Sequence, residues 1–418
     1  MELKKYKLGE ICEVVNGATP STKDSDNYDG SIIWITPKDL SDQKKKYIKR
    51  GQRMITEKGF NCCSAQMIPP YNILMSSRAP IGLLAINQSE CCTNQGFKNL
   101  VLDKTLCDVD FMYYYLKFHI KEIEALGTGT TFMEVSKSSL LNFEVKIPNI
   151  NMQRDIAKCL SDIDRKIELN KQINDNLEAM AKQLYDYWFV QFDFPDGEGK
   201  PYKASGGKMV WNEKLKREIP EGWKVQDLRE FSEIKNGATP STTDEANYGG
   251  DIVWITPKDL SDQKSKFVYQ GERNITKHGF DSCSTSMLPV GSVLMSSRAP
   301  IGLVSIAKEE VCTNQGFKSL VPHSLDDSIY LYYYIKHHIK QIEQLGTGTT
   351  FKEVSREDLC KFPILVVGEE KAYKQWIKVQ NAIAEKQFVL TKEIAELTKQ
   401  RDELLPLLMN GQASVNAD

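Results

Sequence analysis

The chain contains the same long segment twice, and this repeat constrains the fold more than any other feature. Blocks of identical sequence recur in the same order at an offset of 220 residues (236 minus 16), which becomes 219 (345 minus 126) after a deletion in the second copy. Solenoid units repeat every ~20 to 50 residues, so a period of this length is a whole domain that occurs twice. The five blocks are NGATPST (16–22 and 236–242), TPKDLSDQK (36–44 and 256–264), LMSSRAPIGL (74–83 and 294–303), CTNQGFK (92–98 and 312–318) and LGTGTTF (126–132 and 345–351), the last with EVS one residue later.

Each copy mixes strand and helix patterns. Short β-rich runs such as SIIWIT, NILMSS and GLLAI alternate with Gly, Pro, Asn and Asp turn residues. They are followed by the helical stretches FMYYYLKFHIKEIEAL and IYLYYYIKHHIKQIEQL. These patterns predict two tandem α+β domains, over residues 1–150 and 219–368.

A long amphipathic helix is expected after each domain, over residues 151–190 and 369–410. In the first helix Ile156, Leu160, Ile163, Ile167, Leu177 and Leu184 fall at heptad-compatible spacings, as do Val379, Ile383, Leu390, Ile394, Leu397 and Leu404 in the second. If a twofold axis relates the two halves, the helices pair as an antiparallel coiled coil. About 35 residues at ~1.5 Å each make a spacer of ~50 Å, more than one turn of B-DNA.

Two details of the first helix and its end leave alternatives open. Asn170 and Asn174 either continue the apolar seam as polar residues that fix its register, or the seam shifts locally onto Ile173. Beyond the helix, FDFPDGEGKPYKASGG is rich in Gly, Pro and charge. This composition predicts a linker or exposed connection over residues 191–218.

The bulk properties exclude several classes of protein. No signal-peptide pattern and no run of ~20 apolar residues is present, which predicts a soluble cytoplasmic protein. The formal net charge of −2 excludes a generally basic nucleic-acid coat but not local basic patches. The ten cysteines include no CxxC pair, so we expect reduced thiols in two cores, with a Cys63–Cys92 disulfide and its counterpart as the alternative.

Three stretches of the sequence resemble a known family. QRDIAKCLSDIDRKIELNKQINDNLEAMAKQLYDYWFVQFDF resembles the central region of the specificity subunits of type I restriction-modification systems. IPEGWKVQDL resembles the usual entry to their target recognition domains, and RDELLPLLMNGQ resembles their distal helix. The resemblance covers essentially the whole chain.

The resemblance implies a sequence-specific DNA-binding function. Each of two target recognition domains reads one half of a bipartite site, and the paired helices dock two adenine methyltransferase subunits, to which two restriction subunits can be added. No cofactor is expected in this chain; S-adenosylmethionine, ATP and Mg are expected on the partner subunits. Family members usually have two different recognition domains, whereas the copies here are nearly identical, so we expect a nearly palindromic target.

Basic residues and arginines are the first candidates for DNA contact. The run KKKYIKRGQR contains Lys44, Lys46 and Arg53, whose counterparts are Lys264, Lys266 and Arg273; they suit phosphate contacts, with a solvated face as the alternative. SSRAPIG places Ser77 with Arg78, and Ser297 with Arg298, at a turn after an apolar strand. Each arginine could bind guanine O6 and N7 bidentately, with a structural salt bridge as the competing interpretation.

Polar residues of three other repeated motifs complete the set. Asn94 and Gln95, repeated as Asn314 and Gln315, can pair with adenine, or the asparagine can form a turn with the following glycine. GTGTTF, with Thr128 and Thr347, suits backbone contact to a phosphate or a helix-ending turn. Lys38 and Asp39, with Lys258 and Asp259, could reach guanine and cytosine, or could shape a turn.

No catalytic motif is apparent in the sequence. IPPY at 68–71 resembles part of an amino-methyltransferase motif but has Ile68 where that chemistry needs Asn or Asp, and the second copy reads LPVG. Gly-rich cofactor loops, HExxH and nucleophile elbows are absent from the sequence. We therefore expect a non-catalytic DNA-reading subunit, with a protein-binding scaffold of duplicated domains as the alternative.

Overall fold

The computed structural model describes residues 2–78, 80–129, 133–348, 352–368 and 370–413. The chain divides into two compact units, unit 1 (residues 1–169 and 394–418) and unit 2 (residues 170–393). The long helices α7 (Ile150–Tyr185) and α14 (Glu370–Met409) each contribute to both units. Each unit is therefore a domain together with a part of both helices.

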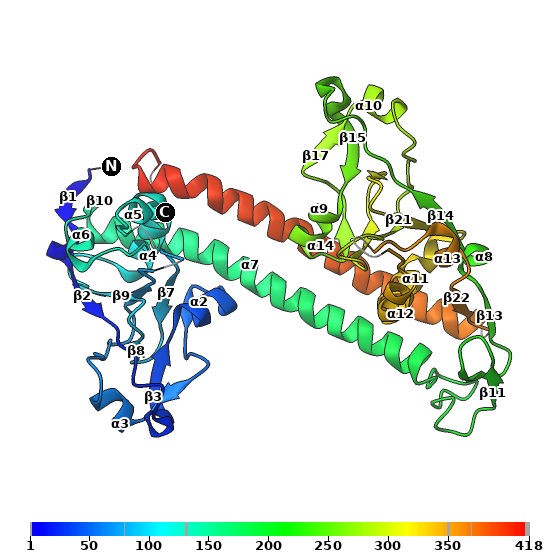
Figure 1. The fold of residues 1–418 in the computed structure, drawn as a ribbon, viewed down its shortest axis with the longest axis horizontal. Coiled ribbons are helices and arrows are strands. Elements are labelled where there is room, and N and C mark those ends of the chain that lie inside the picture. Colours follow the sequence, from blue (N-terminus) through cyan, green and yellow to red (C-terminus); the bar gives the residue numbers. More distant parts are fainter. Residues whose placement is uncertain (1, 79, 130–132, 349–351, 369, 414–418) are drawn as a thin grey trace. The chain divides into compact units, whose positions relative to one another are not determined.

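Unit 1 contains a five-stranded sheet in the order β2-β9-β6-β7-β4, a three-stranded sheet β5-β3-β8 and a pair β1-β10. Its main core lies between the larger sheet and the helix α4, whose residues are hydrophobic nearly all round and buried. Figure 1 shows these elements around the first part of α7. The strands are β1 (Lys4–Lys7), β2 (Cys12–Asn16), β3 (Tyr28–Ile35), β4 (Tyr47–Ile48), β5 (Met54–Ile55), β6 (Ile73–Met75), β7 (Leu84–Asn87), β8 (Cys92–Thr93), β9 (Lys98–Leu102) and β10 (Glu144–Ile147), and the shorter helices are α1 (Leu8–Ile11), α2 (Pro37–Gln43), α3 (Glu57–Asn61), α4 (Val109–Phe118), α5 (Ile120–Ala125) and α6 (Lys137–Leu141).

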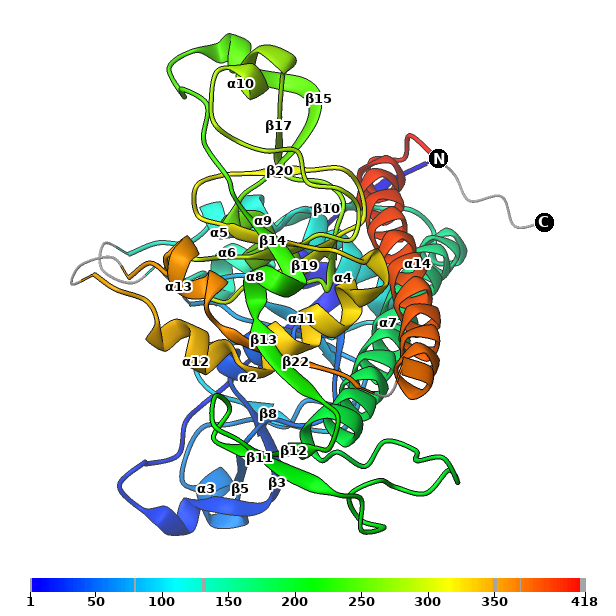
Figure 2. The same cartoon turned by 90° about the vertical axis from the view of Figure 1, so that its right-hand side faces the viewer.

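Unit 2 repeats this architecture with sheets β14-β21-β18-β19-β16, β17-β15-β20 and β13-β22, which confirms the tandem α+β domains. In Figures 1 and 2, β15, β17 and α10 project together from the rest of the unit. The strands are β11 (Met209–Asn212), β12 (Arg217–Pro220), β13 (Lys224–Asp227), β14 (Ser232–Asn236), β15 (Tyr248–Ile255), β16 (Phe267–Val268), β17 (Arg273–Ile275), β18 (Val293–Met295), β19 (Val304–Ala307), β20 (Cys312–Thr313), β21 (Lys318–Pro322) and β22 (Pro363–Val366), and the shorter helices are α8 (Leu228–Phe231), α9 (Pro257–Gln263), α10 (Lys277–Asp281), α11 (Ser328–His337), α12 (Ile339–Gln344) and α13 (Arg356–Cys360).

The two long helices run antiparallel within each unit. In unit 2 the Gln380 side-chain amide donates to the Ala181 carbonyl (2.9 Å), and the Gln387 side-chain amide donates to the Asn174 carbonyl (3.5 Å). The residue numbers therefore rise along α14 as those of their partners fall along α7, which is the pattern of an antiparallel pair. In unit 1, Arg401 of α14 contacts Asp164 of α7 at 3.0 Å. Asn170 is buried, which supports the polar-seam alternative over a shift onto the partly exposed Ile173.

The segment predicted as a linker, residues 191–218, is built into unit 2. Phe192 and Phe194 are fully buried and pack with Trp223, and β11 pairs with β12 as a hairpin. Most of the segment is exposed or half-buried, as in an exposed connection, but the two phenylalanines pack in an aromatic cluster that later parts of the chain complete. The segment therefore stabilises the second domain.

Three further expectations concern thiols, metals and membranes. All ten cysteines are free in the structure, so the alternative Cys63–Cys92 disulfide is not formed. Among the described residues, no group of three or more His, Cys, Asp or Glu side chains could hold a metal ion. Within the same residues, no helix is both long and apolar enough to cross a membrane.

Candidate nucleic-acid interface

Three repeated motifs that are distant in sequence meet in unit 1 just after β6. The Ser77 amide donates to the Gly96 carbonyl (2.7 Å) in the turn before β9, and the Val135 amide donates to the Ser77 carbonyl (3.0 Å). Thr128 and Glu134 exchange two backbone hydrogen bonds of 3.0 Å, which close the segment that begins GTGTTF. Candidate residues of SSRAP, TNQGFK and GTGTTF therefore share one site.

Arg78 lies in this site in an ion pair with Glu134. The Arg78 Nε donates to one carboxylate oxygen of Glu134 at 2.9 Å, and Lys98 Nζ lies 2.9 Å from the other. Burial opposes ionisation of Glu134, but the hydrogen bonds from Lys98 and Arg78 prevail and lower its pKa. The salt bridge that competed with base contact is therefore present, yet the Arg78 side chain remains 47% exposed.

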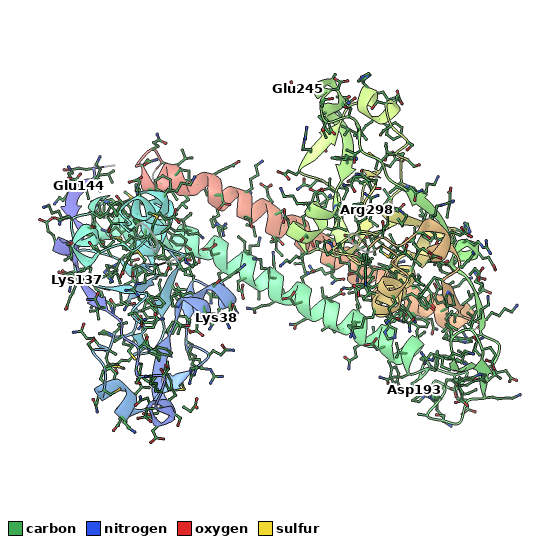
Figure 3. The ribbon with its side chains drawn as sticks, in the orientation of Figure 1. Lys38, Lys137, Glu144, Asp193, Glu245 and Arg298 are labelled. Atoms are coloured by element: carbon green, nitrogen blue, oxygen red, sulfur yellow. The ribbon has the colours of Figure 1, made fainter. Side chains whose placement is uncertain are left out.

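Unit 2 contains the same arrangement around Arg298. Its Nε donates to Glu353 at 2.9 Å, and Lys318 Nζ lies 2.9 Å from the second carboxylate oxygen. Thr347 and Glu353 again exchange two backbone hydrogen bonds, and Ser297 donates to Gly316 (2.7 Å). Figure 3 labels Arg298 on the segment that follows β18. The repeat of sequence is thus also a repeat of site geometry.

The two serines that precede these arginines face inward. Ser77 and Ser297 are fully buried, and the Ser297 hydroxyl donates to the Gly316 carbonyl at 3.2 Å. Successive side chains of an extended chain point to opposite sides, so an exposed Arg78 places Ser77 inside. As folded, neither hydroxyl can reach DNA, which corrects the expectation for these two serines.

The asparagines of TNQGFK form turns and the glutamines remain exposed. The Asn94 and Asn314 side chains accept a hydrogen bond at 2.9 Å from the amides of Gly96 and Gly316, which is the turn alternative. The next residues, Gln95 and Gln315, are exposed. Each glutamine accepts a hydrogen bond from a threonine of the NGATPST motif, Thr19 or Thr239.

The aspartates of TPKDL cap helices. Asp39 is buried, and its carboxylate accepts hydrogen bonds from the amide (2.8 Å) and hydroxyl (2.6 Å) of Thr36 and from the Gln52 amide (2.6 Å). Asp259 does the same in α9. This capping box supports the turn-shaping alternative and leaves neither carboxylate free for cytosine.

The lysines of TPKDL do remain accessible. Lys38 is exposed in the first turn of α2 (Figure 3), and Lys258 is exposed in α9, where it pairs with Glu272 at 2.7 Å. Both lysines are accessible to DNA, and their contact with DNA stays a prediction.

Two lysines of the basic run are buried against the long helices. Lys46 Nζ lies 2.7 Å from Asp110 and donates to the Ser161 hydroxyl of α7 at 2.8 Å. Lys266 donates to the Tyr333 hydroxyl at 2.6 Å and lies 3.2 Å from Glu178 of α7. These partners anchor each domain on its part of the helices, in place of the expected phosphate contacts. This role could not be predicted from the sequence because the partners are distant along the chain.

The remaining members of the run are exposed. Lys44 and Lys264 occupy the left-handed C-cap positions of α2 and α9, with φ of 48° in both. Arg53 and Arg273 stack on the rings of Tyr28 and Tyr248, at 4.0 and 3.9 Å from the ring centroids. A guanidinium held flat on an aromatic ring keeps its donors available at the surface.

The GTGTTF segments are described in part. Thr128 and Thr347 are exposed at the start of each segment. The residues 130–132 and 349–351, which carry the rest of the expected phosphate-binding loop, lie outside the described residues.

The sequence model of the type I restriction modification DNA specificity domain matches residues 1–179 and again 220–407. The chain belongs to the type I restriction enzyme specificity subunits. Each match covers one repeat with most of the long helix that follows it, and DNA sequence specificity is therefore the function of this specificity subunit.

Known relatives of the specificity subunit match most of its length. The MjaIX specificity subunit of Methanocaldococcus jannaschii is 30% identical over 98% of this chain and 93% of its own. The HindI specificity subunit of Haemophilus influenzae is 28% identical over 70% of this chain and 74% of its own. The crystal structure of an S subunit from M. genitalium has the same fold, with a TM-score of 0.65 at 16% identity, over 100% of this chain and 97% of that one.

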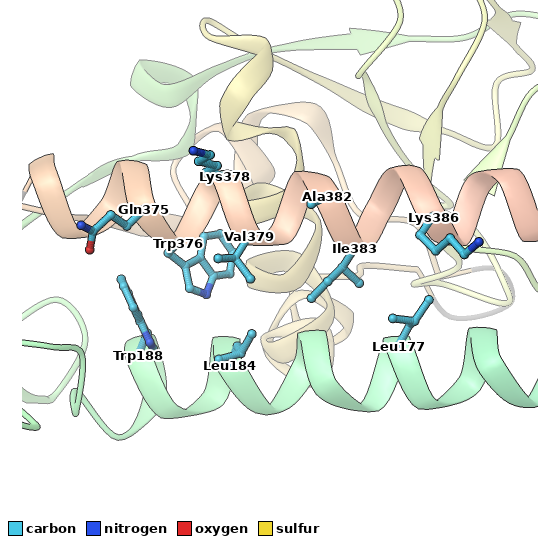
Figure 4. Close-up of a pocket in the computed structure, with 10 residues that line it drawn as sticks. All are labelled: Leu177, Leu184, Trp188, Gln375, Trp376, Lys378, Val379, Ala382, Ile383 and Lys386. Atoms are coloured by element: carbon cyan, nitrogen blue, oxygen red, sulfur yellow. The ribbon is translucent and has the colours of Figure 1, made fainter.

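The specificity subunit also has an apolar groove along the helices of unit 2. It has a volume of about 780 Å³ and lies between the second part of α7 and the first part of α14, as Figure 4 shows. Val379, in its wall, is 49% exposed, which is high for a residue at an expected seam position. The groove is lined by Leu177, Leu184, Trp188, Gln375, Trp376, Lys378, Val379, Ala382, Ile383 and Lys386.

Sequence reasoning missed two pairs of residues in the arginine sites. Glu134 and Glu353 lie in the EVS block, and Lys98 and Lys318 end the TNQGFK block, so all four were visible as repeated charges. Their meeting with the arginines depends on strand register, which the repeat itself does not reveal. Charged residues that recur at the same place in both copies are the signal that could have identified them.

Proposed function

We propose that this specificity subunit reads a split DNA target whose two halves are nearly identical and inverted. The observation that carries the proposal is the equality of the two arginine sites, in which Arg78 and Arg298 have equivalent partners at the same 2.9 Å distances. Two sites that present the same side chains to DNA are expected to recognise the same bases, which favours a target with two equal half-sites. The inversion is an expectation from the order of the sequence, in which each domain is followed by a long helix and a twofold axis would relate the two halves.

The chain itself performs no chemistry in this proposal. It binds double-stranded DNA and positions two adenine methyltransferase subunits, and in the complete restriction enzyme two restriction subunits. S-adenosylmethionine, ATP and Mg are bound by those partners. The apolar groove of unit 2 is proposed as part of a methyltransferase-binding surface, because an exposed apolar groove on otherwise polar helices suits burial by another protein.

The proposal can be tested by methylome sequencing. A methylation-free bacterial host would express the specificity subunit with the methyltransferase subunit encoded beside it, and every modified adenine would be mapped. A host with the methyltransferase subunit alone is the control. We expect one split motif with inverted, matching halves.

Two other outcomes are informative. An asymmetric split motif would retain DNA reading but refute the equality of the half-sites. No modification, together with no DNA binding by the assembled complex at near-physiological salt, would favour a protein-binding scaffold instead.

A further inference from the structure

Each arginine site contains a carboxylate whose role in DNA reading is a separate question. We infer that Glu134 and Glu353 are positioning residues for base recognition, each holding one side of an arginine so that its outer edge is presented to a guanine. The inference rests on the proposed function, because it assumes that Arg78 and Arg298 read bases.

The hydrogen bond to Glu134 leaves the outer edge of Arg78 available. Glu134 engages the Nε of the guanidinium at 2.9 Å, and among the described residues neither Nη group has a hydrogen-bond partner. The two Nη groups are the fork that can donate to O6 and N7 of one guanine. A side chain that is 47% exposed and fixed at Nε therefore offers this fork to an incoming base.

Glu134 is itself fixed from two directions. Lys98, whose side chain is only 10% exposed, binds the second carboxylate oxygen at 2.9 Å. The backbone of Glu134 forms β-bridges to both Arg78 and Thr128. Recognition of a base requires the two Nη groups of the arginine to be placed accurately. A carboxylate held this firmly orders the Arg78 side chain before DNA binds, so that less conformational entropy is lost on binding.

The second copy reproduces the geometry although its sequence spacing differs. Arg298 and Glu353 are one residue closer in sequence than Arg78 and Glu134, yet the ion pair is again 2.9 Å and the arginine again 47% exposed. The backbone bridges from Glu353 to Arg298 and Thr347 are also repeated. The arrangement has therefore survived a deletion between its parts, as expected if the pairing itself matters.

The net charge of each site allows a positioning role of the glutamate to be distinguished from a role in charge balance alone. One arginine, one lysine and one glutamate give +2 − 1 = +1 per site. If the glutamate only balanced charge, its removal would leave +2 and strengthen binding to all DNA through the phosphates. A positioning residue, in contrast, is needed for the difference between target and non-target DNA.

The test compares target with non-target DNA for the double variant Glu134→Gln with Glu353→Gln. The full chain, assembled with its methyltransferase subunit, is titrated against duplexes with the mapped motif and with a scrambled motif. We expect the ratio of the two affinities to fall by about tenfold or more, within the ~1 to 3 kcal/mol that a bidentate base contact contributes to discrimination. Binding to the scrambled duplex should be unchanged or tighter.

Two controls keep the test specific. Glu144→Gln with Glu357→Gln makes the same change of charge at exposed pairs with Lys5 and Lys361, and should leave the ratio unchanged. In a background of Arg78→Ala with Arg298→Ala, the glutamate changes should have no further effect on the ratio.

Two results would overturn the inference. They are an unchanged ratio, including the case in which both duplexes are bound equally more tightly, and an effect that persists without the arginines, which would indicate a purely structural role. If the complex with the wild-type chain prefers its motif over the scrambled duplex, the proposed function stands and only the inference fails. Lack of that preference would refute the proposed function and the inference together.

Discussion

Removing the Glu178 carboxylate tests how the buried lysine of unit 2 is stabilised. Lys266 is 6% exposed and is bound by Glu178 (3.2 Å), the Tyr333 hydroxyl (2.6 Å) and Gln387 (3.1 Å). Burial lowers the pKa of Lys266 from 10.5 to about 8, although Glu178 opposes this shift. In a Glu178→Ala variant we expect the pKa to fall further, so that Lys266 loses its proton near neutral pH.

The size of the effect follows from proton linkage. Because the folded pKa lies below the unfolded one, the unfolded state binds more protons between pH 8 and 10.5, and stability rises with pH in this window. At pH 7 the shift costs about 3 kcal/mol, and complete loss of the proton would cost about 5 kcal/mol, at ~1.4 kcal/mol per pKa unit. Loss of Glu178 should therefore destabilise by about 1 kcal/mol through Lys266, because the two costs differ by one pKa unit (8 minus 7), and by ~1 kcal/mol more through lost hydrogen bonds.

Urea denaturation of the full chain at pH 7 and pH 10 measures this. The Glu178→Ala variant should lose about 2 kcal/mol at pH 7 but only about 1 kcal/mol at pH 10, where Lys266 is neutral with or without Glu178. Adding Lys266→Met should recover part of the loss, since an apolar side chain needs no partner. Glu357→Ala, which breaks the exposed pair with Lys361 in the same unit, is the matched control. An equal loss at both pH values would refute the argument.

Three further predictions concern the DNA site and the groove. Asp39→Ala should reduce the free energy of unfolding by about 2 kcal/mol through loss of the helix cap, and a changed methylation motif at unchanged urea stability would contradict this. Arg78→Lys with Arg298→Lys keeps the charge but removes both forks, so competition titrations should show specific binding weakened by ~10-fold or more and scrambled DNA bound as before; equal weakening on both duplexes would make both arginines phosphate contacts. Val379→Asp should weaken methyltransferase binding in a size-exclusion or calorimetric assay, whereas Val389→Asp, exposed on α14 outside the groove, should not. Equal effects of the last two changes would exclude the groove as a docking surface.

The architecture could be predicted from the sequence because it depends on periodic features. The 220-residue repeat indicated two equal domains, and heptad spacing indicated both long helices within a few residues of α7 and α14. The packing of the two phenylalanines in residues 191–218 could not be predicted, for the opposite reason. Burial of Phe192 and Phe194 depends on contacts with later parts of the chain, such as Trp223, and local composition carries no record of such contacts.

The candidate site could be predicted only as a set of segments. The blocks around Arg78, Gln95 and Thr128 do meet, but the exposure of individual side chains did not follow from the sequence. Lys44 and Lys46 illustrate this, since they lie two residues apart and only Lys44 is exposed. Asp110, which pairs with Lys46, belongs to a helix that no local pattern connects with the basic run.

Unit 1 is formed by two separate parts of the chain, and this affects the order in which the two units can fold during synthesis on the ribosome. Leu408 and Met409 are buried in the main core of unit 1, beside residues of the first 160, whereas unit 2 is one continuous stretch. At ~5 to 20 residues per second, synthesis of the intervening 240 residues (409 minus 169) takes roughly 10 to 50 s. During this time the first domain to emerge has an unfilled apolar surface while the second can fold completely. The domain that is translated first is therefore the one that is finished last.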